Sequence, residues 1–288
     1  MALQPRVSEV ERLLFRSDVV VIGTFRCPAG HPLFVESEPT SGHLMVFPRT
    51  SAIIDSPRAG RVTAGPASVL FYNRGEAYRR RKIDAVHEAD WFMIAPEVVR
   101  DVVSGGGEGF PFFIGPASAR TYLAQRRLSN ALHRGELDAL AVEECVMRLL
   151  GESVEEAARK QTRAMKISAD IEAVKARIGA RPAANPTLRS LASLAGCSPF
   201  HLSRLFPRAT GYTLTEYRHA VRVRSALAAL RDPRTDLTQL ALDLGYSSHS
   251  HFTMVFRRHF GITPSEFRNS PSPPLPFRRD TQLPAAMR

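Results

Sequence analysis

The chain has 288 residues, of which 44% are hydrophobic and 23% are charged, and its formal net charge is +11. This composition is typical of folded proteins and argues against disorder, while the length favours two domains over one. No apolar run approaches the roughly 18 residues that a membrane span needs. The N-terminal stretch MALQPRVSEVERLLF also lacks a signal-peptide pattern. We therefore expect a cytoplasmic protein without a membrane partner.

The amino-terminal part predicts a β-rich domain. Five runs rich in β-branched and aromatic residues read as short strands, at residues 19–25, 44–47, 52–54, 69–72 and 91–94. Glycine- and proline-containing turns separate these runs, and many short strands with frequent turns favour a sandwich or a barrel. The glycine-rich residues 104–109 lack the Lys and Ser/Thr of a phosphate loop, so we interpret them as a connection.

Residues 116–166 change to a helical pattern. Tyr122, Leu128 and Leu132 share one apolar face, and a second face follows from Leu137 to Leu150. Two such helices beside a β domain either pack on that domain or pair with a second chain, so a homodimer is one expected partner.

The last third of the chain contains one pattern twice, about fifty residues apart. The first copy is LASLAGCSPFHLSRLFPRATGYTLTEYR and the second is LALDLGYSSHSHFTMVFRRHFGITPSEFR. Gly196 corresponds to Gly245, Phe206 to Phe256 and Gly211 to Gly261. The second copy has one additional residue between its two glycines. A repeat at fixed period indicates one supersecondary unit used twice. Short apolar helices on both sides of a glycine turn predict that this unit is a helix-turn-helix.

The caps and the charge support this interpretation. Ser198 is a predicted N-cap with Pro199 in the first turn, and either Ser247 or Ser248 caps the corresponding helix of the second copy. A helix from Tyr217 to Leu230 should join the two units. Residues 168–288 carry 17 Lys and Arg against 8 Asp and Glu, whereas residues 1–167 carry 22 against 20. A positive charge concentrated on the repeated segment favours a polyanionic partner.

Residues 168–269 resemble the DNA-binding domain of the AraC/XylS family of bacterial transcription regulators. The matching residues are Ser198, Leu202, Arg204, Phe206, Gly211, Tyr217 and Arg222 in the first half, and Gly245, Tyr246, Ser250, Phe252, Phe256, Phe260, Gly261, Thr263, Pro264, Phe267 and Arg268 in the second. The resemblance implies two helix-turn-helix units joined by a linker helix, with both reading helices in successive major grooves of double-stranded DNA. Family members often carry an N-terminal cupin-like β-barrel that binds a small-molecule effector and dimerises.

By position, the resemblance assigns base contacts to Phe200, Ser203 and Arg204 in the first reading helix and to His249, Ser250, His251 and Met254 in the second. The fork of Arg204 fits O6 and N7 of guanine, with a phosphate clamp or a surface ion pair as alternatives. His251 has a base, a phosphate or solvent as alternatives. Some family members carry arginine where Met254 stands. Phosphate contacts are expected from His201, Arg257, Arg258 and His259.

No metal or cofactor site is predicted. A metal-binding cupin needs a His-x-His motif followed closely by Glu, which His31, Glu36, Glu38, His43 and His87 do not provide. Cys27, Cys145 and Cys197 are scattered, which supports three free thiols rather than disulfides or a zinc finger. Five aromatic residues either line a pocket or, as is more common, form part of the hydrophobic core: Phe47, Phe71, Tyr72, Trp91 and Phe92. The basic run at residues 79–82 reads as a solvated loop or strand edge, with DNA or an acidic partner as the alternative.

The predicted architecture is therefore α+β and multidomain. It has a cupin-like β-barrel domain (1–115), a helical dimerisation or connector region (116–166), an all-α DNA-binding domain (167–269) and a disordered tail (270–288). We expect a sequence-specific transcription factor, not an enzyme, that occupies promoters and contacts or blocks RNA polymerase. The alternative is a metal-dependent cupin-type enzyme with an attached DNA-binding domain.

Overall fold

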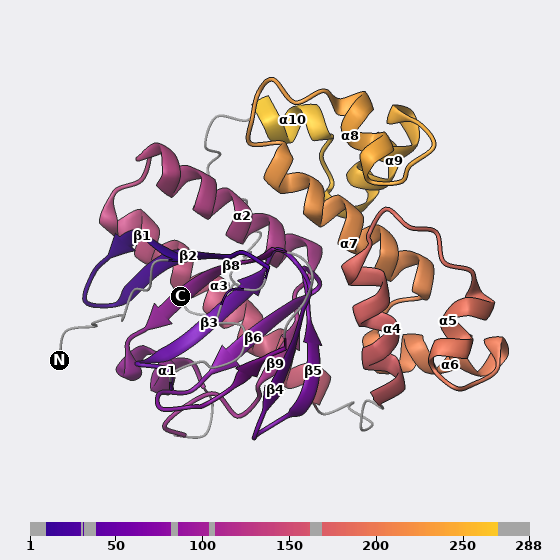
Figure 1. The fold of residues 1–288 in the computed structure, drawn as a ribbon. Helices are drawn as coiled ribbons and strands as arrows, with labels where there is room; N and C mark the ends of the chain where they lie inside the picture. Colours follow the sequence, from indigo (N-terminus) through magenta and orange to yellow (C-terminus); the bar gives the residue numbers. More distant parts are fainter. Residues whose placement is uncertain are drawn as a thin grey trace, which may run out of the picture.

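A computed structural model describes residues 10–29, 31, 39–81, 86–103, 107–161 and 169–269. The predicted disordered tail, Glu36, Glu38, Lys82 and part of the glycine-rich segment lie outside these described residues. The chain is α+β, with strands gathered in the amino-terminal part and helices in the carboxyl-terminal part (Figure 1).

Two antiparallel sheets form the amino-terminal domain. The larger has six strands in the order β1 (Glu11–Arg16), β2 (Val20–Cys27), β8 (His87–Ile94), β3 (His43–Pro48), β6 (Ser68–Tyr72) and β9 (Ile114–Pro116). The smaller has β5 (Gly60–Ala64), β4 (Ala52–Ser56) and β7 (Arg79–Arg80). β2 pairs with β8 along its whole length, from Val20 opposite Ile94 to Cys27 opposite His87.

Each sheet ends on strands that have one neighbour among the described residues. The closed barrel predicted from the sequence is therefore wrong, and the domain consists of two open sheets. All five predicted strand runs are present as strands, and Arg79–Arg80 of the basic run form the edge strand β7, which agrees with the predicted strand edge. Strands β1, β5 and β9 were not predicted, because they contain charged residues, glycine or only three residues and lack the apolar alternation that identifies a strand.

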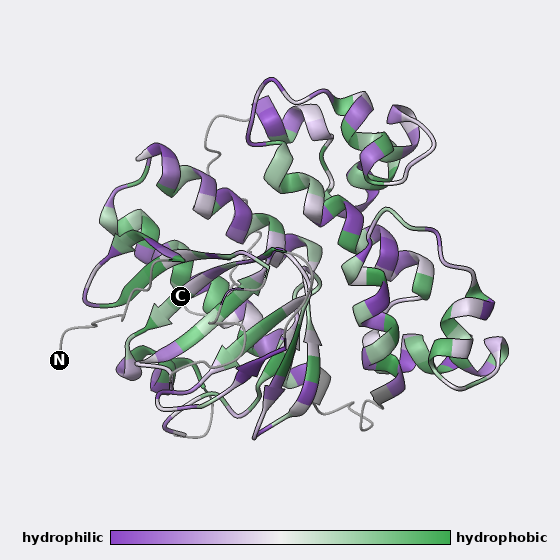
Figure 2. Ribbon diagram, viewed as in Figure 1, coloured by the Kyte–Doolittle hydropathy of each residue, from purple (hydrophilic) through white to green (hydrophobic). Residues whose placement is uncertain are grey.

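The six-stranded sheet has a different covering on each face. Alternate residues such as Ile22, Phe47 and Phe92 face a core that includes residues of three helices, α1 (Pro96–Val102), α2 (Ala119–Arg134) and α3 (Ala139–Gln161). On the other face, Leu70 and Tyr72 pack with residues of β4 and β5. Figure 2 shows the hydrophobic residues concentrated along these strands. The five aromatic residues considered as a pocket lining are at most 6% exposed and belong to the core of the domain.

The predicted apolar faces of α2 and α3 pack inside the chain. Tyr122 and Leu128 of α2 are 1% exposed and share one core with Val146 of α3 and with Phe252 and Phe256 of the carboxyl-terminal part. Helix α2 contacts α3 on one side and the carboxyl-terminal helices on another. Of the two predicted faces, Leu140 is the residue left largely exposed. Burial of these faces leaves little apolar surface on α2 and α3 for pairing with a second chain.

Seven helices form the described carboxyl-terminal part: α4 (Ala169–Ala180), α5 (Leu188–Leu194), α6 (Pro199–Thr210), α7 (Leu214–Ala229), α8 (Leu237–Asp243), α9 (His249–Phe260) and α10 (Pro264–Asn269). Helix α7 corresponds to the predicted linker helix and begins three residues earlier than predicted, because Thr213 and Glu216 form a capping box. Figure 1 shows α5 and α6 on one side of α7 and α8 to α10 on the other.

Arg224 of α7 connects this helical part to the amino-terminal domain. Its side chain is 1% exposed, and Nη1 donates to the carbonyl oxygen of Pro66 at 2.6 Å. Nε donates to Nε2 of His259 in α9 at 3.1 Å, and the guanidinium lies over the ring of Tyr122 in α2, 5.1 Å from its centroid. A second junction forms where Oγ1 of Thr63 donates to the carbonyl oxygen of Glu172 in α4 at 3.0 Å. Both helix-turn-helix units are thus attached to the sheets.

A buried ionic cluster connects β8 to α2. Asp90 of β8 is 1% exposed, and its Oδ2 accepts from Arg126 Nη1 at 2.5 Å and from Gln125 Nε2 at 2.8 Å. Nη2 of Arg49 lies 3.3 Å from Oδ1. Burial acts to raise the pKa of Asp90, but the charges of Arg126 and Arg49 outweigh it and hold the pKa below its usual range.

Asp90→Asn should lower the free energy of unfolding by about 3–5 kcal/mol, because it leaves two buried guanidinium groups without their counter-charge. Urea denaturation followed by circular dichroism measures the change. Asp55→Asn is the matched control, since Asp55 pairs with Arg61 and Arg81, which are more than half exposed. Exposed pairs contribute at most about 1 kcal/mol. Equal losses in the two variants would contradict the structural role assigned to Asp90.

His259→Gln should make stability less sensitive to acid. Burial, and secondarily the charge of Arg224, lower the pKa of His259 from 6.5 to about 3. Between these values the unfolded chain binds a proton that the folded chain does not, so the stabilisation is complete above pH 6.5 and is lost as pH falls. The slope that one such histidine contributes approaches about 1.4 kcal/mol per pH unit.

Urea denaturation of wild type and His259→Gln at several values between about pH 7 and pH 5, a range that spans an ordinary histidine pKa, measures this slope. The variant should show a shallower dependence than wild type. His201→Gln, at an exposed position on α6, is the control and should retain the wild-type slope. A His259→Gln slope equal to wild type would refute the buried, neutral state of His259.

Candidate nucleic-acid interface

The first helix-turn-helix consists of α5 and α6. Oγ of Ser198 accepts from the backbone N–H of His201 at 3.1 Å, which confirms the predicted cap, and Pro199 occupies the first turn of α6. Leu202 and Phe206 are fully buried and pack against Tyr217 of α7, with the rings of Phe206 and Tyr217 5.4 Å apart in an edge-to-face arrangement. Apolar residues at this spacing fix which side of α6 faces the solvent.

The second unit repeats this design with α8 and α9. Ser248 is the cap, and its Oγ accepts from the backbone N–H of His251 at 3.1 Å. Phe252 and Phe256 take the places of Leu202 and Phe206 and are fully buried. Gly245 forms the turn with a φ of +77°, and a Cβ there would overlap the carbonyl oxygen of Ala183. No other residue fits that turn, because both the backbone angle and the space exclude a side chain.

Arg222 of α7 joins the two units. It is 2% exposed, and its guanidinium donates to the carbonyl oxygens of Pro182, Ala183, Ala184 and Gly245 at 2.6–3.0 Å. Nη2 also donates to Oδ1 of Asn185 at 3.1 Å. One side chain therefore connects the segment before α5 to the turn before α9. The sequence identified Arg222 only through the family resemblance.

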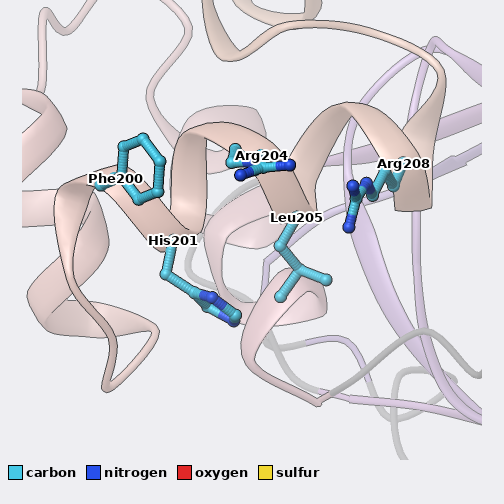
Figure 3. Close-up of a pocket in the computed structure, with 5 residues that line it drawn as sticks. All are labelled: Phe200, His201, Arg204, Leu205 and Arg208. Atoms are coloured by element: carbon cyan, nitrogen blue, oxygen red, sulfur yellow. The ribbon is translucent and has the colours of Figure 1, made fainter.

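Four of the predicted contact residues lie on the outward side of α6. Phe200 is 70% exposed, and His201, Ser203 and Arg204 are exposed as well. The guanidinium of Arg204 lies 5.6 Å from the centroid of the Phe200 ring. Figure 3 shows these two side chains next to each other, with His201 and Leu205 projecting from a different side of the helix. Exposed cations beside an exposed ring suit contact with a nucleic acid.

Arg208 adds a cation that the sequence analysis did not assign. It is exposed and lies with Phe200, His201, Arg204 and Leu205 around one shallow pocket on α6 (Figure 3). The sequence signal for this role of Arg208 was its position one turn after Arg204, since residues four apart share a helix face.

The outward side of α9 is more varied. Ser250, Arg257 and Arg258 are exposed, and Met254 is 62% exposed. His249 and His251 are half-buried. Nε2 of His249 lies 3.3 Å from Oγ1 of Thr253, and Nδ1 of His251 lies 3.3 Å from Oγ of Ser247. The ring of His251 also contacts Tyr246 edge to face, with centroids 5.3 Å apart. Both histidines are therefore oriented by neighbours within the unit.

His259 does not lie with the other predicted phosphate contacts. It is half-buried at the junction with the amino-terminal domain, where Nε2 accepts from Arg224. Its lowered pKa, about 3, leaves the ring uncharged at neutral pH. A phosphate contact by His259 stays a prediction, and this position does not support it, because the ring carries no charge and its Nε2 is engaged within the chain.

The described residues contain no group of three or more His, Cys, Asp or Glu side chains that could hold a metal ion. Nδ1 of His43 instead lies 3.4 Å from Oδ1 of Asn73, while Nδ1 of His87 lies 3.3 Å from Oγ1 of Thr50. Cys27 and Cys145 are buried free thiols, and Cys197 is a half-buried one. Over the same described ranges, no helix is long and apolar enough to cross a membrane.

Comparison with known proteins finds similarity over the repeated segment. Residues 191–270 match a family model described as a helix-turn-helix domain. The probable transcription factor PqrA of Proteus vulgaris is 35% identical over 85 residues, which are 30% of this chain and 70% of PqrA. The regulatory protein SoxS of Escherichia coli K12 is 38% identical over 79 residues, which are 27% of this chain and 74% of SoxS.

Solved structures resemble the chain only weakly as a whole. ToxT of Vibrio cholerae O395 has a TM-score of 0.37 and 12% identity over 88% of this chain and 98% of ToxT, which is too low for any functional inference. PqrA and SoxS are each matched over more than two thirds of their own length, and the match to the family model lies on the two units built around α6 and α9. The chain belongs to the AraC/XylS family of DNA-binding transcription regulators.

Proposed function

We propose that this chain binds specific promoter sequences by placing α6 and α9 in successive major grooves on one face of the DNA. The main support is the exposure of the outward sides of both helices while Arg222 fixes the two units to each other. A major groove about 12 Å wide admits an α-helix. The excess positive charge of residues 168–288 adds a favourable release of counterions on binding.

The residue roles follow from position and exposure. Base contacts are proposed for seven residues: Phe200, Ser203, Arg204, His249, Ser250, His251 and Met254. Phosphate contacts are proposed for His201, Arg257 and Arg258, and Arg208 joins them because of its place on α6. Arg204 has the sharpest assignment, since its planar fork matches O6 and N7 of guanine and its guanidinium lies over the exposed ring of Phe200.

The amino-terminal domain is proposed to regulate this binding. Arg224 contacts the turn at Pro66, helix α2 at Tyr122 and helix α9 at His259, so a shift of the sheets would reach the second unit directly. A small-molecule effector acting through residues 1–115 and RNA polymerase at the bound promoter are the further partners we propose. A homodimer would have to use surfaces other than the buried faces of α2 and α3.

A regulator fits these observations better than an enzyme. Exposed cations and paired reading helices serve DNA binding, and no cluster among the described residues favours the metal-dependent alternative. The role of the regulator is then occupancy of a promoter, followed by recruitment or obstruction of RNA polymerase. Footprinting on the region upstream of the gene and its neighbours tests this role. Binding to duplex DNA without any protected sequence would contradict it.

Arg204→Ala should weaken binding to the protected sequence by about 5- to 150-fold, corresponding to about 1–3 kcal/mol, and relax the preference at one base pair. Arg257→Ala is the matched control: it should weaken binding to all sequences alike and reduce the salt dependence by about one counterion. Titrations of specific and unrelated duplexes at several salt concentrations distinguish the two. If Arg204→Ala behaved as the control does, Arg204 would be a phosphate contact.

A further inference from the structure

The internal repeat makes Arg204 and Met254 equivalent. Within the reading helices, Leu202 corresponds to Phe252 and Phe206 to Phe256, and all four side chains are fully buried. Arg204 and Met254 each lie midway between these two anchors. Because the anchors orient both helices in the same way against their supporting units, Arg204 and Met254 occupy the same place on the two reading surfaces.

The two side chains are both exposed but differ completely in chemistry. Met254 is 62% exposed, in a surface that also contains the exposed residues Ser250, Arg257 and Arg258. A single exposed apolar residue is ordinary on a protein surface. What distinguishes Met254 is its position, because it replaces the forked cation of the first unit with a thioether that has no hydrogen-bond donor.

The chemical groups on the base edges in the major groove determine which base a methionine side chain favours. Guanine presents two acceptors, O6 and N7, which Met254 would cover and remove from water without offering a donor. Thymine presents a C5-methyl group, the apolar feature of this groove, and contact with it removes apolar surface from both partners. Met254 should therefore favour thymine and disfavour guanine at the position where the first unit favours guanine.

We infer that Met254 reads a thymine methyl group, so that the chain recognises an asymmetric site with guanine opposite α6 and thymine opposite α9. The inference rests on the proposed binding of both helices in major grooves. It assigns different specificities to two units of one design, and it gives the bound protein a single orientation on the DNA. A promoter site of this kind needs no inverted repeat.

Selection of binding sites from a random duplex pool tests the inference, using the full chain and the variants Met254→Arg and Arg204→Met. Wild type should enrich a two-part site with guanine in one part and thymine in the other. Met254→Arg should change that thymine to guanine and leave the first part unaltered. Arg204→Met is the matched exchange and should change the guanine to thymine with the second part unaltered.

An identical enriched site for wild type and Met254→Arg would overturn the inference while leaving the proposed function intact. Absence of any enriched sequence for wild type would instead overturn the proposed function, and the inference with it. The three proteins should show the same circular dichroism and melting, since both substitutions lie on exposed positions.

Replacement of one methyl group tests the contact itself. Deoxyuridine in place of the selected thymine should weaken wild-type binding about fourfold, the loss expected for one buried methyl group. Met254→Ala should bind the thymine and deoxyuridine duplexes equally. Deoxyuridine at a thymine outside the enriched site should have no effect on either protein. A loss of that size that persists in Met254→Ala would assign the methyl contact to another residue and refute the inference.

Discussion

Two buried arginines on α7, two residues apart, hold the carboxyl-terminal half in one arrangement. Arg222 binds the units to each other through backbone carbonyl oxygens, and Arg224 binds them to the amino-terminal domain through the carbonyl oxygen of Pro66 and the ring of Tyr122. Burial lowers the pKa of both groups, with no effect on their charge at neutral pH. A buried cation surrounded by carbonyls is satisfied in very few geometries, because each donor needs an acceptor in its own direction. These contacts therefore select a geometry more than they add stability.

This arrangement supports the regulatory role proposed for the amino-terminal domain. The core around Ile22 and Phe92 continues through Tyr122 of α2 into Phe252 and Phe256 of the second unit, without a solvent layer between. The first unit has a separate core, which Ala67 of the β5–β6 turn joins. A change in the sheets would therefore act on the two units through different contacts. That difference suits a proposed regulator in which an effector alters the angle between the reading helices rather than covering them.

The sequence predicted the helix-turn-helix units closely because their information is local. Caps at Ser198 and Ser248, and the turn at Gly245, depend on residues a few positions away. The sequence held one signal for the position of His259, since its equivalent in the first unit is the small apolar residue Ala209. Long-range contacts were not accessible in this way. The apolar stripe of α2 indicates burial but does not name the partner, and the partners prove to be the carboxyl-terminal helices as well as α3. Sheet closure likewise depends on edge pairing, which no residue of β1 or β9 signals.

Duplication within one chain changes what a regulator of this size can recognise. A homodimer presents two identical reading helices, and its twofold symmetry imposes a matching symmetry on the site. Here the repeat has kept the buried anchors, with Phe206 and Phe256 both inaccessible, while the outward residues have diverged between Arg204 and Met254. Retention of the anchors preserves the angle of each helix, and divergence on the surface is the basis of the two different specificities that we propose. In the proposed function the linker helix positions both units, so that two grooves are reached without a second chain. The apolar faces of α2 and α3 are then buried in a core that includes Phe252 and Phe256 of the second unit.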